Sequence, residues 1–302
     1  MSETPRAWLI DASIYIFRAW FSMPDRWYTD DGFPVQAVYG YTRFLVDIIE
    51  QCGPAFSGAA AFDESLGTNF RNEIYPQYKE SRELPDEALA FQLDACRRVT
   101  ELLGFGCYGG ERYEADDYLG ALAKQARAKG LAVTVVTRDK DLGQLLAGPH
   151  DEWWDFAQDK VLDADGFAAQ FGVRPAQFAD YLALVGDKID DIPGVPGVGA
   201  KTAAALLQAF ESLEGLHSNL EAVGTLGIRG AARTQERLVA HWPQVELSRQ
   251  LTGIAQDIPG IEEVPRYELT AHAVAAAIEY LESLNLGGAL ARRLNKLAES
   301  VA

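Results

Sequence analysis

The sequence predicts an α/β protein built on one parallel sheet with a group of acids at its carboxyl edge. Three apolar, strand-like segments, residues 8–11, 59–63 and 133–141, each run into aspartate. Roughly the first 160 residues also alternate strand and helix patterns, which is typical of parallel strands joined by crossover helices. Because open α/β sheets bind ligands at the carboxyl ends of their strands, this edge is the predicted functional site.

The other elements of this half follow in alternation. A helix is predicted over residues 35–50, where apolar residues recur at helical spacing. Acids in a first helical turn mark residues 84–87 as a helix start, and that helix should continue to residue 103. Beyond it, the pattern predicts a helix over residues 118–129, ended by a glycine, and a strand near residues 152–156.

From about residue 163 the pattern turns helical and stays so to the end of the chain. Phe167, Phe171 and Phe178 belong to its apolar stripes. The charge pattern does not shift sharply, so the boundary falls in a broad zone between residues 160 and 185. We therefore predict an α/β domain over residues 1–180 and a helical domain over residues 181–302.

Composition and charge limit the classes of protein that fit. The 302 residues are 48% hydrophobic and 24% charged, as in globular proteins, and no apolar run is long enough to span a bilayer. The chain lacks a signal-like start and its cysteines lack CxxC spacing, so a cytoplasmic protein with reduced thiols is expected. A net charge of −17 argues against a broad basic face, so nucleic-acid contacts would rest on a few placed cations and backbone N–H groups.

Acidic residues carry the strongest functional signal. Any one of them is explained as a helix cap, a turn residue or a solvated side chain, but their repeated placement at strand ends is not. Converging carboxylates would not stay ionised without cations, which points to hard divalent ions such as Mg²⁺ or Mn²⁺. The ten candidates are Asp11, Asp63, Glu114, Asp116, Asp117, Asp139, Asp141, Asp187, Asp190 and Asp191.

Two ions suit this number of acids better than one. Two-metal hydrolysis of a phosphodiester needs ions about 3.5–4 Å apart, and such a pair uses more carboxylates than a single ion. The ligands predicted for one ion are Asp11, Asp63, Glu114 and Asp116. Those predicted for the other are Asp139, Asp141, Asp187 and Asp190, with Asp117 in support.

A segment rich in proline and glycine, residues 191–202, follows the last acids and runs into a predicted helix. It is not a P-loop, because Ala200 separates Gly199 from Lys201 and no strand precedes it. A turn containing Gly197 and Gly199 between two helices would expose backbone N–H groups to a DNA phosphate without reading sequence. A plain turn between helices is the alternative interpretation.

The stretch from Arg71 to Arg82 mixes basic and aromatic residues. Lys79 and Arg82 could stabilise charge on a scissile phosphate, and Tyr78 could stack on a nucleobase. On composition alone, a solvated helix whose cations extend along its surface is the favoured interpretation.

Taken together, these segments resemble the bacterial 5′→3′ exonuclease/flap endonuclease family, which includes the N-terminal nuclease domain of bacterial DNA polymerase I. The motifs follow the family's order from residue 9 to about residue 210. They are Asp11 with Phe17 to Trp20, Phe62-Asp63, Phe70-Arg71, Tyr78-Lys79 with Arg82, Glu114 to Asp117, Thr137 to Asp141, and Gly186-Asp187 on through Thr202.

The resemblance implies a PIN-like nuclease core over residues 1–180, with a helical arch near residues 70–90. It also implies a helix–three-turn–helix element near residues 185–210 in a C-terminal DNA-binding domain. The implied activity is Mg²⁺- or Mn²⁺-dependent cleavage near the base of a 5′ flap, with 5′ exonuclease activity. The implied partner is DNA with 5′ flaps or 5′ ends, bound by a monomer without sequence preference, and RNA–DNA hybrids are further substrates.

Residue roles follow from the same resemblance. Lys79 and Arg82 match the catalytic cations of the arch. The implied DNA contacts are Arg18, Arg71, Tyr78, Gly197, Gly199 and Lys201. In some members the hairpin also holds K⁺ through backbone carbonyls, which here would be those of Val195, Gly197 and Val198.

The chain departs from the family pattern at a few positions. Ala12 stands where glycine is usual, Asp191 stands where asparagine is usual, and residues 83–90 are short and acidic, which predicts a small arch. Two rival functions are a DNA-junction-binding protein with vestigial catalysis and a PIN-type ribonuclease. The intact acids argue against the first, and the hairpin after Asp187 argues against the second.

Overall fold

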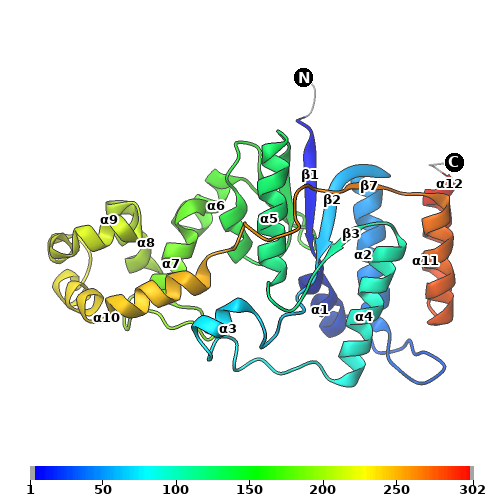
Figure 1. Ribbon diagram of the computed structural model, residues 1–302, viewed down its shortest axis with the longest axis horizontal. Helices are drawn as coiled ribbons and strands as arrows, with labels where there is room; N and C mark the ends of the chain where they lie inside the picture. Colours follow the sequence, from blue (N-terminus) through cyan, green and yellow to red (C-terminus); the bar gives the residue numbers. More distant parts are fainter. Residues whose placement is uncertain (1–3, 300–302) are drawn as a thin grey trace.

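A computed structural model describes residues 4–299 and has a seven-stranded sheet at its centre (Figure 1). The strand order is β3-β2-β1-β4-β5-β6, and β7 also pairs with β2. The parallel strands are β1 (Arg6–Asp11), β2 (Ala55–Ala61), β3 (Gly106–Tyr108), β4 (Ala132–Val136) and β5 (Glu152–Asp155). The prediction of an α/β protein on a parallel sheet is confirmed.

Helices cover both faces of this sheet. One face packs against α1 (Ala12–Ser22), α2 (Gln36–Cys52), α4 (Glu87–Leu102), α11 (Ala271–Ser283) and α12 (Gly287–Glu299). The other packs against α5 (Ala115–Ala128) and a 3₁₀ turn, Asp141–Leu145. Neighbouring strand residues point to opposite faces, so Ile10 joins the first core and Leu9 the second. Three of the predicted helices are therefore confirmed as α2, α4 and α5.

The helices between β6 and β7 build a second unit with its own core, which lies to one side of the sheet in Figure 1. Its members are α6 (Ala164–Phe171), α7 (Phe178–Val185), α8 (Ala200–Phe210), α9 (Leu213–Ser218) and α10 (Ala231–Thr252), with 3₁₀ turns at Pro175–Gln177 and Leu220–Thr225. Phe167 and Phe178 lie fully buried in this core, as the apolar stripes predict.

Two antiparallel strands complete the sheet, and neither is visible in the sequence pattern. β6 (Lys160–Leu162) pairs with β5, and β7 (Arg266–Glu268) pairs with the first half of β2. Strands of three residues are too short to show a period, so the prediction of helix to the end of the chain is wrong at β7. Tyr267 holds that strand in place, because its ring packs 4.6 Å from Phe56 and 4.2 Å from Phe105 between centroids.

The last helices also return to the sheet. α11 packs against α4 and α12 packs against α2, rather than against the helical unit. The predicted domain of residues 181–302 therefore contains two groups of helices that pack on different cores. The ends of both predicted domains, residues 1–3 and 300–302, lie outside the described residues.

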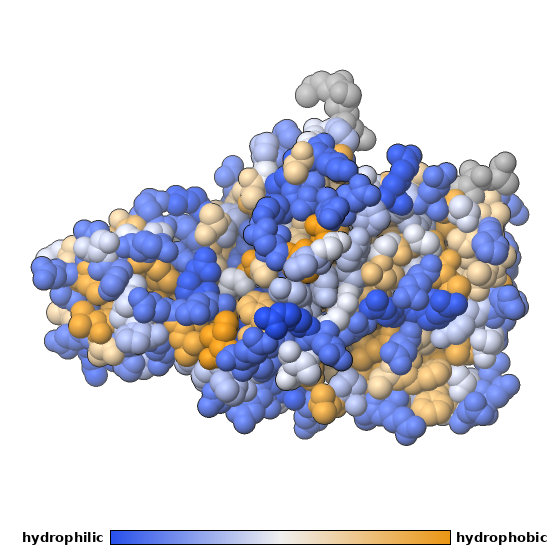
Figure 2. All heavy atoms as spheres, viewed as in Figure 1, coloured by the Kyte–Doolittle hydropathy of each residue, from blue (hydrophilic) through white to orange (hydrophobic). Residues whose placement is uncertain are grey.

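The surface in Figure 2 is mostly hydrophilic, with apolar residues in small patches. No helix among residues 4–299 is long and apolar enough to cross a membrane.

Candidate functional site

The predicted acids of the first group meet at the carboxyl edge of the sheet. β1 lies between β2 and β4 in parallel register, so its last residue, Asp11, lies beside the ends of both neighbours. The Asp11 carboxylate caps α1 by accepting from the Ile14 amide at 3.3 Å, and it accepts from the Thr137 hydroxyl at 2.8 Å. Asp63 follows β2, and its amide donates to the Ser13 hydroxyl at 2.8 Å.

Burial makes these carboxylates costly to ionise. It raises the pKa of Asp11 to about 7, and the like charges of Asp139 and Asp63 add to the effect. Burial and the charges of Asp139 and Asp11 raise the pKa of Asp116 well above its ordinary value. No side chain or amide among residues 4–299 donates a hydrogen bond to the Asp116 carboxylate. Such carboxylates have oxygen atoms available for a cation.

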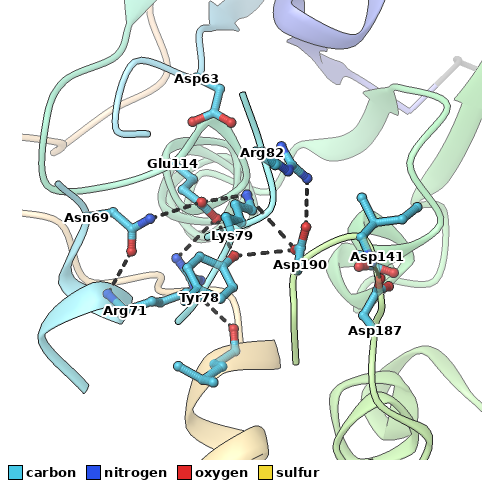
Figure 3. Close-up of polar contacts among 12 residues, drawn as sticks. Asp63, Asn69, Arg71, Tyr78, Lys79, Arg82, Glu114, Asp141, Asp187 and Asp190 are labelled. Carbon is cyan, nitrogen blue, oxygen red and sulfur yellow. Dashed lines mark hydrogen bonds and ion pairs between the residues drawn. The ribbon is translucent and has the colours of Figure 1, made fainter. Parts of the chain in front are cut away.

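A second group of acids lies where β4 ends and where the chain leaves α7. The Asp141 amide donates to the Asp139 carboxylate at 2.9 Å. Lys140 joins the two segments, because its Nζ lies 2.9 Å from Asp141 and 3.2 Å from Asp187. Burial and the charge of Asp139 raise the pKa of Asp141 to about 7. Figure 3 shows Asp141 and Asp187 side by side, apart from Glu114 and Asp63.

Lys79 and Arg82 lie among the acids (Figure 3). The Nζ of Lys79 is 2.5 Å from Glu114, and a guanidinium nitrogen of Arg82 is 2.6 Å from Asp190. Burial would raise the pKa of Glu114, but the charges of Lys79 and Arg71 outweigh it and hold this pKa below its ordinary value. Lys79 is only 9% exposed, so its charge interacts with the neighbouring acids more than with solvent.

The segment that carries these cations differs from a continuous helical arch. Residues 70–90 form the short helix α3 (Phe70–Ile74), then turns and coil up to α4. The segment is fastened to the loop after α7, because the Lys79 amide donates to the Asp190 carbonyl at 3.1 Å and the Ser81 amide to the Asp191 carboxylate at 2.8 Å. It therefore lies directly on the acids as a closed cover.

The carboxylates stand apart in this structure, with cations of the protein between them. Among residues 4–299, no three Asp, Glu, His or Cys side chains form a group tight enough to hold an ion. Lys79, Arg82 and Lys140 instead lie between the acids and neutralise part of their charge. The donor set nevertheless fits a hard divalent ion, since every donor is an oxygen and several carboxylates are buried with raised pKa values.

Two predicted site residues have structural roles instead. Arg71, which is 2% exposed, donates to both carboxylate oxygens of Asp117 at 2.7 and 2.8 Å, and to the carbonyls of Leu251 and Gly253 at 2.8 Å each. A DNA contact by Arg71 stays a prediction, and it would require the guanidinium to leave these partners. Asp117 also accepts from the amides of Glu114 and Ala255, so its oxygens are already engaged. It supports the site by fixing Arg71 and the start of α5.

Tyr78 is likewise not available to a nucleobase in this structure. Its ring is 3% exposed and packs with Ile192 and Leu251. Its hydroxyl donates to Glu114 at 2.9 Å. The predicted stacking stays a prediction, and it would require the ring to leave this buried position.

The hairpin of the helical unit has the predicted form, with α7 and α8 on either side of a tight turn. The Val198 amide donates to the Val195 carbonyl at 2.9 Å, and Gly197 takes a left-handed φ of 75°, as the third position of a type II turn requires. Val195 and Val198 are buried, whereas Gly197, Gly199 and Lys201 are exposed.

Some residues that shape the site were missed in the sequence. Thr137 and Ser13 orient the strand-end acids, and Asn69 donates to Glu114 at 3.1 Å. Lys140 had a visible signal, since it stands between two predicted acids. The predicted DNA contact Arg18 lies exposed on α1 beside Arg43, where both line a surface pocket.

The fold and the site define a class of α/β protein in which an acid-lined sheet edge adjoins a helical unit with a hairpin rich in proline and glycine. The family described as "5'-3' exonuclease, N-terminal resolvase-like domain" matches residues 6–172. The one described as "5'-3' exonuclease, C-terminal SAM fold" matches residues 173–274. The chain belongs to the 5'-3' exonuclease family.

Curated relatives agree with this family. DNA polymerase I of Pseudomonas aeruginosa is 38% identical over 259 residues, which cover 85% of this chain and 28% of that protein. The thermostable DNA polymerase I of Thermus aquaticus is 36% identical over 262 residues, 84% of this chain and 29% of that protein. The chain thus spans less than a third of the length of these relatives.

Solved structures share the fold at low identity. A zinc-bound bacteriophage T5 5'-exonuclease aligns with a TM-score of 0.64 and 16% identity over 98% of both chains. The catalytic core of Rad2 in complex with a DNA substrate aligns with a TM-score of 0.62 and 14% identity, covering 100% of this chain and 94% of that one.

Proposed function

We propose that this chain is a structure-specific 5′ nuclease that hydrolyses phosphodiesters in branched or 5′-ended DNA, as a flap endonuclease and a 5'-3' exonuclease. One observation carries the proposal: two groups of buried carboxylates share one sheet edge, with Lys79 and Arg82 between them. The family supports it, as does the fold shared with a T5 flap endonuclease solved with DNA and metal ions, at a TM-score of 0.64 and 15% identity.

The proposed cofactors are two Mg²⁺ or Mn²⁺ ions. We assign the first to Asp11, Asp63, Glu114 and Asp116, and the second to Asp139, Asp141, Asp187 and Asp190. Asp117 is left out because Arg71 and two amides already use its oxygens. When bound, such a pair of ions stabilises the attacking and leaving oxygens of a phosphodiester.

In this proposal, Lys79 and Arg82 pair first with acids of the protein and then with the DNA. In the structure described here they neutralise Glu114 and Asp190, which lets the acids stay close together. Once the acids are neutralised otherwise, Lys79 and Arg82 can turn to a scissile phosphate and offset the charge that develops on it. The exchange would also require the segment to release its hydrogen bonds to the loop after α7.

Finer features of the proposal concern the DNA and its surroundings. The hairpin would hold a duplex phosphate through backbone N–H groups, and its carbonyls at Val195, Gly197 and Val198 would take K⁺. Arg18 would add a contact on the sheet domain, and RNA–DNA hybrids would serve as further substrates. A monomer in the cytoplasm fits the three free cysteines, since a reducing compartment keeps thiols unpaired.

The test is cleavage of a 5′-labelled double-flap DNA in Mg²⁺, beside an EDTA control and the Asp139→Ala variant. We expect metal-dependent cuts near the flap base that the variant loses, while Asp94→Ala, which removes an exposed acid on α4, keeps them. Binding of the flap without any cut in Mg²⁺ or Mn²⁺ would favour the junction-binding alternative. Cleavage of single-stranded RNA alone would favour the ribonuclease.

A further inference from the structure

The hairpin rests against one face of α10. Ser248 donates to the Pro193 carbonyl at 2.6 Å, and Gln244 donates to the Gly194 carbonyl at 2.6 Å. Arg237 lies seven residues before Gln244, about two helical turns, and therefore on the same face. Its guanidinium packs on Gly197, where an added Cβ would overlap it. The face of α10 thus follows the hairpin from its first residues to its tip.

Among residues 4–299, Arg237 has no counter-charge, a state that it shares with Arg229 and Arg233 of this unit, and its guanidinium packs on the hairpin glycine. Arg249 pairs with Asp180 at 2.6 Å, and Arg174 pairs with Glu211. Within residues 4–299, the guanidinium of Arg237 makes no ion pair or hydrogen bond, and neither does the ammonium group of Lys201 in the first turn of α8. In a chain with a net charge of −17, two uncompensated cations beside one exposed turn form an unusual positive spot.

We propose that Arg237 binds the same DNA backbone phosphate as the hairpin, next to Lys201 and the amides of residues 197–199. The inference rests on the proposed function and adds a phosphate-binding residue from a distant helix. A guanidinium suits this place because its planar fork can donate two hydrogen bonds to one phosphate. The contact carries no sequence information, so it acts equally on all flap duplexes. Glycine is then required at position 197 for two reasons. Its backbone is left-handed, and a Cβ would overlap the Arg237 guanidinium.

The experiment measures the Kd of a flap duplex in Mg²⁺ as a function of salt, in an Asp139→Ala background that does not cleave. Arg237→Ala should weaken binding about 5- to 10-fold and lower the slope of log K against log salt by about one, as expected for one lost phosphate contact. Arg237→Lys should keep the slope. The control is Arg292→Ala, which removes the same charge from an exposed position on α12, and it should change neither quantity.

Each other outcome has a distinct meaning. An unchanged Kd and slope in Arg237→Ala overturn the inference and leave the proposed function intact. Weaker binding with an unchanged slope and a lower Tm would make Arg237 a brace for the hairpin, which also overturns it. A parent protein that binds no flap duplex would overturn the proposed function itself.

Discussion

The sheet edge and the hairpin handle charge in opposite ways. At the sheet edge the chain gathers more carboxylates than it can ionise, and it brings three of its own cations among them. At the hairpin, Arg237 and Lys201 stand beside exposed backbone, and neither pairs with an acid among residues 4–299. The first region has the charge to attract cations, and the second has the charge to attract an anion. Under the proposed function, this separation would let an acidic protein act on acidic DNA.

The largest effect of a substitution is expected for Arg71→Ala, which tests whether Arg71 has a structural role and not a role in binding cations or an anion. Arg71→Ala leaves Asp117 buried and unpaired, so the free energy of unfolding should fall by about 3–5 kcal/mol. Urea denaturation measures this. The matched control is Arg112→Ala, whose ion pair with Glu73 is exposed and should contribute less than about 1 kcal/mol. Equal losses in the two variants would refute the structural role of Arg71.

Lys79→Ala tests the catalytic side of the comparison. We expect kcat on a flap substrate to fall about 10²–10³-fold, because one cation facing the developing charge is gone. The Kd for duplex should change by less than about 3-fold, since the hairpin is intact. Single-turnover kinetics and equilibrium binding separate the two quantities. A larger loss in binding than in turnover would make Lys79 a binding residue only.

Without metal, the stability of the protein should depend on pH because buried carboxyl groups lie close together. Burial raises the pKa of Asp11 and of Asp141 to about 7, so the folded protein holds protons there that the unfolded chain releases at lower pH. Stability of the metal-free protein should therefore fall as pH rises from about 4 to about 7, by up to about 4 kcal/mol for each of the two groups. In EDTA the Tm should be lower at about pH 8 than at about pH 5.5, and Mg²⁺ should reverse the order. Asp11→Asn, which cannot ionise, should lose part of this dependence; an unchanged profile would contradict the account.

The smallest effect compares two glycines of the hairpin. Gly197→Ala meets both a left-handed backbone and the Arg237 guanidinium, so it should cost about 1 kcal/mol of stability and weaken duplex binding. Gly199 has an ordinary φ and open space around an added Cβ, so Gly199→Ala loses only the preference for glycine at the N-cap of α8 and should cost about 0.5 kcal/mol. Thermal unfolding of both variants measures the difference, and equal Tm shifts would contradict it.

Features of this fold that depend on local sequence patterns could be predicted, whereas contacts between residues far apart in the sequence could not. Strand-end acids such as Asp11 and Asp63 could be predicted, because periodicity locates a strand and parallel pairing brings its end to a common edge. The hairpin could be predicted for a similar reason, since a short run of proline and glycine has few conformations.

Contacts between distant segments were out of reach. Arg71 meets Asp117 46 positions away, and Arg237 meets Gly197 40 positions away. Burial of Tyr78 depends on Leu251, which belongs to α10. No local pattern encodes such contacts, so the sequence did not indicate the partners of Arg71 and Tyr78 or any role for Arg237. β7 was missed for the same reason, because its pairing with β2 is its only signal.

The return of the chain at β7 has a mechanical consequence. The polypeptide leaves the sheet after β6, builds the helical unit, and rejoins the same sheet on β2. Two chain segments therefore connect the unit to the sheet, which restricts its motion more than a single linker would. Under the proposed function, this double connection would fix the distance between the acids and the hairpin, and with it the distance from the bound duplex to the cut.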